Sequence, residues 1–155
     1  MKDDYMKSAI KEAYKAYKNN EVPVGAVIVK NDKIISKAYN RKEERCCVIE
    51  HAEINAIIKA SKKLQNWRLN GCDMYVTLEP CPMCASAIKQ ARIDHVYYLF
   101  DSTSCENKKI VKEIFTNIDA NKPVENIKMN YDFDNINFIT FFFKKQRSET
   151  NVLDR

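Results

Sequence analysis

The chain is poor in glycine: its 155 residues contain only Gly25 and Gly71. Phosphate-binding loops of the GxGxxG and GxxxxGK[ST] types need closely spaced glycines, so nucleotide binding through such loops is excluded. The chain also lacks an apolar segment near its N-terminus and any uninterrupted run of about 18 apolar residues. We therefore expect no secretion signal, no membrane helix, and a reducing, cytoplasmic location.

Composition and length indicate one globular domain. Apolar residues make up 45% of the chain and charged residues 30%, which is unlike a disordered, collagen-like or coiled-coil sequence. The formal net charge of +5 permits a nucleic-acid partner without requiring one. In a reducing compartment, the six cysteines are expected to be thiols or metal ligands.

Hydrophobic periodicity predicts strands that alternate with helices. Helices are expected over residues 4–19, 49–64, 82–92, 107–117 and 134–147, with Asp3 or Asp4 capping the first and Asp134 the last. Strands are expected over residues 24–29, 33–40, 74–78, 95–100 and 127–131. This order predicts a three-layer α/β domain over residues 1–147, with a mixed five-stranded sheet flanked by helices. Residues 148–155 are expected to be a flexible tail.

Two short motifs carry the candidate chemistry. His51-Ala52-Glu53 is followed 30 residues after His51 by Cys81-Pro82-Met83-Cys84. Two thiolates and one imidazole form a typical zinc set, and three protein ligands leave a fourth position open for water, as in catalytic sites. Glu53 is a hard ligand close in sequence to His51, so we expect it to transfer protons rather than bind the metal.

Each motif also has a simpler interpretation. A lone CxxC could be a redox dithiol or two unrelated thiols, and a lone histidine is more often structural. The conjunction of HxE with PCxxC is the signature of zinc nucleobase deaminases, which favours the catalytic metal site. A second metal site could be built from the remaining thiols, but scattered unpaired thiols are the simpler interpretation of Cys46, Cys47, Cys72 and Cys105.

The sequence resembles the bacterial tRNA-specific adenosine deaminases of the cytidine-deaminase-like superfamily. The resemblance rests on six segments: 21–27 (EVPVGAV), 40–41 (NR), 51–54 (HAEI), 66–69 (NWRL), 75–84 (YVTLEPCPMC) and 92–93 (RI). Two segments depart from the family pattern. Residues 47–50 read Cys-Val-Ile-Glu where the family has an Asp-(Pro/Ala)-Thr-Ala sequence, and residues 99–105 lack the glycines usual there.

The resemblance implies a cytidine-deaminase-like fold, one zinc per chain and a role for each matched residue. His51, Cys81 and Cys84 would bind the zinc, and Glu53 would be the general acid and base. Three residues would contact the adenine: Asn40, the backbone of Ala52, and Val22. A C-terminal group would face a tRNA anticodon stem-loop, namely Phe142, Phe143, Lys144, Lys145 and Arg147. The family also implies a homodimer.

The sequence therefore predicts hydrolytic deamination of adenosine to inosine, at the wobble base of a tRNA anticodon. One alternative is a small-molecule deaminase acting on guanine, cytosine or a nucleoside, which would share every metal ligand. Another is a zinc-stabilised binding subunit without turnover, which the altered segments 46–50 and 99–105 permit. Glu53 argues against this last hypothesis, because a structural zinc site has no use for that carboxylate.

Overall fold

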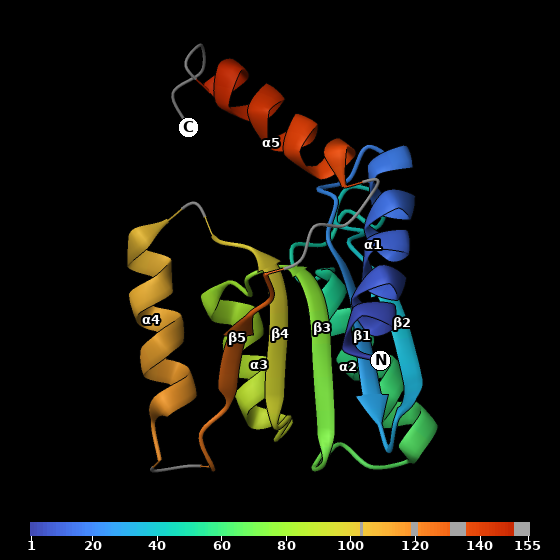
Figure 1. Ribbon diagram of the computed structural model, residues 1–155, viewed down its shortest axis with the longest axis vertical. Coiled ribbons are helices and arrows are strands. Elements are labelled where there is room, and N and C mark those ends of the chain that lie inside the picture. Colours follow the sequence, from blue (N-terminus) through green and yellow to red (C-terminus); the bar gives the residue numbers. More distant parts are fainter. Residues whose placement is uncertain (103, 119–120, 131–135, 151–155) are drawn as a thin grey trace.

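The fold is a mixed sheet of five strands between helices (Figure 1). The computed structural model describes residues 1–102, 104–118, 121–130 and 136–150. In this part of the chain, the strands are β1 (Gly25–Lys30), β2 (Lys33–Tyr39), β3 (Cys72–Leu78), β4 (His95–Phe100) and β5 (Glu125–Lys128). The helices are α1 (Lys2–Lys18), α2 (Ala52–Leu64), α3 (Pro82–Gln90), α4 (Cys105–Thr116) and α5 (Asn137–Thr150).

The strand order across the sheet is β2-β1-β3-β4-β5. β1 pairs antiparallel with β2 and with β3, whereas β3, β4 and β5 run parallel to one another. The β1–β2 pair is the predicted hairpin, and its turn is made by Asn31 and Asp32, both with positive φ. Because β3 and β4 are parallel and each is followed by a helix, the loops after both strands lie at one end of the sheet.

Side chains alternate between two cores, one on each face of the sheet. Ile28, Met74 and Val76 pack with the buried faces of α2, α3 and α4. Val27 and Tyr75 point the other way and pack with Met6 and other residues of α1. The period-2 alternation of β-strands thus gives one helical layer on each side of the sheet, which confirms the expected three-layer architecture.

Gly25 permits the close approach of α1 to the sheet. A Cβ atom built at this position would lie 2.0 Å from the backbone oxygen of Ala9 and 2.4 Å from the backbone nitrogen of Ala13. No residue with a side chain fits there unless the helix moves away.

Several predicted boundaries differ from the structure. α1 begins at Lys2 with Met1 as its N-cap, so Asp3 and Asp4 lie inside the first turn and the predicted cap was wrong. α2 begins at Ala52 rather than near residue 49, and β5 is displaced toward the N-terminus, to Glu125–Lys128. α5 continues through Thr150, past the predicted end at residue 147. Asp134 and residues 151–155 lie outside the described residues.

Among the described helices, none is both long and apolar enough to cross a membrane. All six cysteines are free thiols, in agreement with the expectation from the sequence.

Candidate active site

The three predicted metal ligands lie together at the end of the sheet where β3 ends. The Nδ1 atom of His51 is 3.8 Å from Sγ of Cys81 and 3.5 Å from Sγ of Cys84. One donor atom from each of the three residues lies within 4.8 Å of the other two. Residues 30 positions apart in the sequence are thus brought within reach of one ion.

Helix starts position these side chains. His51 and Cys81 are the N-cap residues of α2 and α3, and both have extended backbone conformations. Pro82 occupies the first turn of α3, where its missing N–H costs no helical hydrogen bond. The positive end of a helix dipole favours the thiolate form of cysteine, so this placement favours metal binding by Cys81 and Cys84.

The two thiols of the group differ in their protonation. Hydrogen bonding from Cys84, together with that from His51, lowers the pKa of Cys81 to about 4. The same bond to Cys81, together with burial, raises the pKa of Cys84. The hydrogen bond with Cys81 also raises the pKa of His51. The shift at Cys81 favours the thiolate, which is the form of cysteine that binds a metal.

Glu53 is almost fully buried beside this group. Its residue is 4% exposed, on the first turn of α2. Burial is the main cause that raises the pKa of its carboxyl group to about 7, and the nearby Cys81 thiolate adds to the shift. Buried carboxyl groups with raised pKa values are typical of proton-transfer sites.

The geometry of the group fits zinc. Zinc binds cysteine sulfur at about 2.3 Å and histidine nitrogen at about 2.0–2.1 Å, so tetrahedral geometry separates sulfur from nitrogen by about 3.5 Å. The observed separations of 3.5 and 3.8 Å are close to this value. His51, Cys81 and Cys84 could therefore hold a zinc ion with one coordination position left for water.

A buried carboxylate anchors the loop that precedes His51. Glu21 is 1% exposed and accepts hydrogen bonds from the backbone N–H groups of Glu43 at 2.7 Å and Glu44 at 3.2 Å. The backbone N–H of Arg41 donates to the carbonyl of Glu50 at 3.0 Å, which closes the base of this loop. The segments that carry Asn40 and His51 are thereby held against each other.

A second buried carboxylate anchors the loop after β4. Glu79 is 7% exposed and accepts a hydrogen bond from the backbone N–H of Ser102 at 3.1 Å. It also lies within 3.5 Å of the Lys108 ammonium group and 3.4 Å of the Asn126 amide nitrogen. Sequence reasoning assigned no role to Glu21 or Glu79. The available signal was an acidic residue at the edge of an apolar segment in each motif.

The other predicted site residues fall into two places. Asn40 is 5% exposed, directly after β2, and its backbone N–H donates to the carbonyl of Val24. Ala52 is buried at the start of α2, and Val22 is partly buried against the core.

The predicted RNA-facing residues lie on α5, which packs on α1 through Phe138 against Tyr14 and Tyr17. On α5, exposed or partly exposed side chains include Phe142, Phe143, Lys144, Lys145 and Arg147.

Comparisons with known proteins agree with this geometry. The cytidine and deoxycytidylate deaminase zinc-binding region matches residues 1–100. A tRNA-specific adenosine deaminase of Aquifex aeolicus is 38% identical over 151 residues, which is 95% of this chain and 97% of that protein. The chain belongs to the tRNA-specific adenosine deaminase family. A Bacillus subtilis protein of the same name is 52% identical over 94 residues, 61% of this chain and 58% of that protein.

The structure of the chain also resembles solved structures of deaminases. A structure from a study of A-to-I editing by tRNA:A34 deaminases superposes with a TM-score of 0.72 at 35% identity, over 82% of this chain and 98% of that one. A guanine deaminase from Bacillus subtilis superposes with a TM-score of 0.63 at 29% identity, over 94% and 93%. The cytidine-deaminase-like fold expected from the sequence is thereby confirmed.

Proposed function

We propose that this chain is a zinc-dependent hydrolase that deaminates adenosine to inosine at the wobble position of a tRNA anticodon. The observation that carries the proposal is the buried carboxylate of Glu53 next to the group His51, Cys81 and Cys84. The near full-length similarity to a tRNA-specific adenosine deaminase supports the substrate. One zinc per chain is proposed, held by those three residues.

Zinc at this site would supply Lewis acidity, which lowers the pKa of water to about 7. In the overall reaction, water adds its oxygen at C6 of adenine and the amino group leaves as ammonia. Glu53 takes one proton from the attacking water and delivers it to N1. It then takes the second proton from the resulting C6 hydroxyl group and delivers it to the leaving amino group. Its burial keeps bulk water away from the carboxyl group, so the proton moves between substrate atoms and this residue.

The base is proposed to sit between Asn40, Val22 and the start of α2. The Asn40 amide would hydrogen-bond the adenine, the backbone of Ala52 would hold its Watson–Crick edge, and Val22 would pack against the ring. A tRNA loop suits a site lined by buried residues. Its bases are already unpaired, so little energy is needed to flip one base into the site.

The remaining assignments concern the partner and the assembly. Phe142 and Phe143 would stack on loop bases, while Lys144, Lys145 and Arg147 would contact phosphates. A homodimer is supported by the exposed apolar side chains of Val48 and Ile49, in the loop just before His51. Acting on tRNA, the protein would work in the cytoplasm, with residues 1–147 as its deaminase domain.

The test is to incubate the purified zinc-loaded protein with an arginine tRNA anticodon stem-loop and detect inosine by mass. A stem-loop with guanosine at the wobble position is the matched control. Inosine confined to the wobble position supports the proposal. Its absence with a zinc-loaded, folded protein would overturn the tRNA assignment.

A small-molecule deaminase is the second candidate. The guanine deaminase structure covers more of this chain than the tRNA deaminase structure does, 94% against 82%. The segment 99–105 also departs from the tRNA enzymes. Release of ammonia from guanine, cytosine or a nucleoside, at a higher kcat/KM than from the stem-loop, would favour this candidate.

A further inference from the structure

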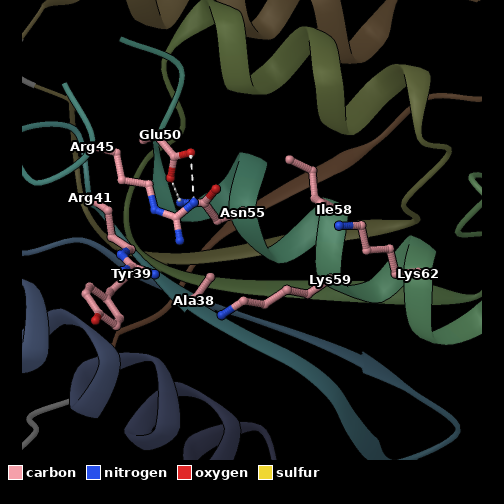
Figure 2. Close-up of a pocket in the computed structure, with 9 residues that line it drawn as sticks. All are labelled: Ala38, Tyr39, Arg41, Arg45, Glu50, Asn55, Ile58, Lys59 and Lys62. Carbon is pink, nitrogen blue, oxygen red and sulfur yellow. Dashed lines mark hydrogen bonds and ion pairs between the residues drawn. The ribbon is translucent and has the colours of Figure 1, made fainter. Parts of the chain in front are cut away.

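A cationic pocket lies between the end of β2 and the outer face of α2 (Figure 2). Two of its residues border the proposed active site in sequence, since Arg41 follows Asn40 and Glu50 precedes His51. Four of the lining side chains are positively charged and one is negatively charged. The lining consists of Ala38, Tyr39, Arg41, Arg45, Glu50, Asn55, Ile58, Lys59 and Lys62.

The positive charge of this pocket is only partly compensated. Arg41 makes two hydrogen bonds to Glu44, at 2.8 and 2.9 Å. Arg45 is 3.8 Å from a carboxylate oxygen of Glu50, whose other oxygen accepts a hydrogen bond from Asn55 at 2.9 Å.

The two lysines of the pocket carry its uncompensated charge. Among the described residues, neither Lys59 nor Lys62 has a carboxylate within ion-pair distance. Lys59 is held in place by donating to the backbone carbonyl of Lys37 at 2.9 Å. The pocket therefore offers two ammonium groups without an acidic partner.

The cationic side chains come from two parts of the chain. Asn55, Lys59 and Lys62 are spaced four and three residues apart, so they share one face of α2. Figure 2 shows the two lysines extending from that helix, with Arg41 and Arg45 in the loop that follows β2. The helix dipole accounts for a lysine in the last turn of α2, but not for two arginines that come from another segment.

We propose that this pocket binds a backbone phosphate of the RNA substrate, a few nucleotides from the reacting base. A phosphodiester carries a full negative charge and several acceptor oxygens, which guanidinium and ammonium groups recognise. Lys59 and Lys62 lie about 12 and 16 Å along the helix axis from His51, so they are beyond the reacting nucleotide itself. The inference rests on the proposed function, because it names RNA as the ligand.

The test compares two variants that each remove two positive charges. Lys59→Ala/Lys62→Ala removes both lysines of the pocket, whereas the control Lys11→Ala/Lys63→Ala removes exposed lysines of α1 and α2 that do not line it. Binding of the arginine tRNA anticodon stem-loop is measured across a salt series, and turnover is measured at saturating stem-loop.

The pocket variant should bind the stem-loop about threefold to tenfold more weakly at low salt. Its slope of log affinity against log salt should be shallower by about 0.7–0.9, the contribution of one neutralised phosphate. Its kcat at saturation should stay unchanged because neither lysine reaches the base. Equal affinities and slopes for the pocket and control variants would overturn the proposal.

Further outcomes of these experiments distinguish a failure of the pocket proposal from a failure of the function on which it rests. If the wild type binds the stem-loop but forms no inosine, the proposed function fails, and the salt slopes still decide the role of the pocket. If the wild type does not bind the stem-loop, both fail. Deamination of adenosine 5′-monophosphate that is lost in the pocket variant would assign the pocket to a mononucleotide phosphate and overturn the RNA assignment.

Discussion

The carboxylate of Glu21 accepts a hydrogen bond from the backbone N–H of Glu43 at 2.7 Å, across 22 residues of sequence. Glu21 precedes β1, whereas Glu43 lies in the loop between Asn40 and His51. The bond therefore fixes the loop that joins the proposed base-contacting and metal-binding residues. Loops have few backbone partners of their own, so one buried acceptor can decide their conformation.

Glu21→Ala should destabilise the protein by about 1–3 kcal/mol, because two loop amides lose their acceptor. The loosened loop should raise KM for the stem-loop more than it lowers kcat. Glu21→Gln keeps one acceptor oxygen and should lose less. Glu43→Ala is the control, because its backbone N–H still donates to Glu21. Urea unfolding and steady-state kinetics measure both effects, and a Glu21→Ala protein as stable as Glu43→Ala would contradict the anchoring role.

Gly25→Ala should destabilise the protein by about 3 kcal/mol or more, because the added methyl group would overlap the backbone of α1. Gly71→Ala is the comparison. A Cβ at Gly71 meets no atom within 4 Å, but its φ of +75° strains an alanine by about 1–2 kcal/mol. Urea unfolding should rank Gly25→Ala as the more damaging change. The reverse ranking would mean that α1 does not pack as closely as the structure has it.

His51→Ala should lose zinc, because it removes the only nitrogen donor of the group. His95→Ala is the matched control: the only other histidine of the chain pairs with Asp73 at 2.6 Å, on a neighbouring strand. Metal analysis should find about one zinc per chain in the wild type and in His95→Ala. Full zinc occupancy in His51→Ala would show that His51 is not a zinc ligand. Dialysis against a chelator should lower the melting temperature of the wild type, because a ligand that prefers the folded chain stabilises it.

Replacing Lys144, Lys145 and Arg147 together by alanine should flatten the salt dependence of stem-loop binding. Each lost phosphate contact reduces the slope of log affinity against log salt by about 0.7–0.9, so the triple change should reduce it by about 2. Zinc content should not change. The control replaces three exposed lysines on other parts of the surface: Lys7, Lys11 and Lys33. Equal slopes for the two triple variants would show that α5 is not part of the RNA-binding surface.

Local patterns predicted most of the fold. The apolar spacing of residues 4–19 and the β-branched run of 24–29 correspond to α1 and β1, because their burial follows directly from helix and strand periodicity. The predicted start of α2 near residue 49 is too early, because the helix begins at Ala52. Residues 50–51 leave the helical conformation so that the imidazole of His51 reaches the two thiols, and this requirement comes from a segment 30 residues away.

The sequence predicts the candidate metal ligands, but it does not predict the buried carboxylates that anchor the neighbouring loops. HAE and PCxxC each carry ligands of known chemistry, so their conjunction predicted that His51, Cys81 and Cys84 meet. Glu21 and Glu79 act through hydrogen bonds to backbone N–H groups more than 20 residues away. No side-chain pattern encodes which backbone amide a carboxylate will reach. The cationic pocket is likewise assembled from β2, a loop and α2, and the charged run of residues 41–45 does not show which helix face it will meet.

The most direct measurement compares inosine formation on the arginine tRNA anticodon stem-loop by the wild type and by Glu53→Ala, with zinc content determined in the same samples. Glu53 is assigned proton transfer, so its loss should slow the reaction by at least about 10²–10⁴-fold while leaving about one zinc per chain. That result would separate the proton-transfer residue from the metal ligands. A Glu53→Ala protein that forms inosine at the wild-type rate, or a zinc-loaded wild type that forms none, would contradict the account.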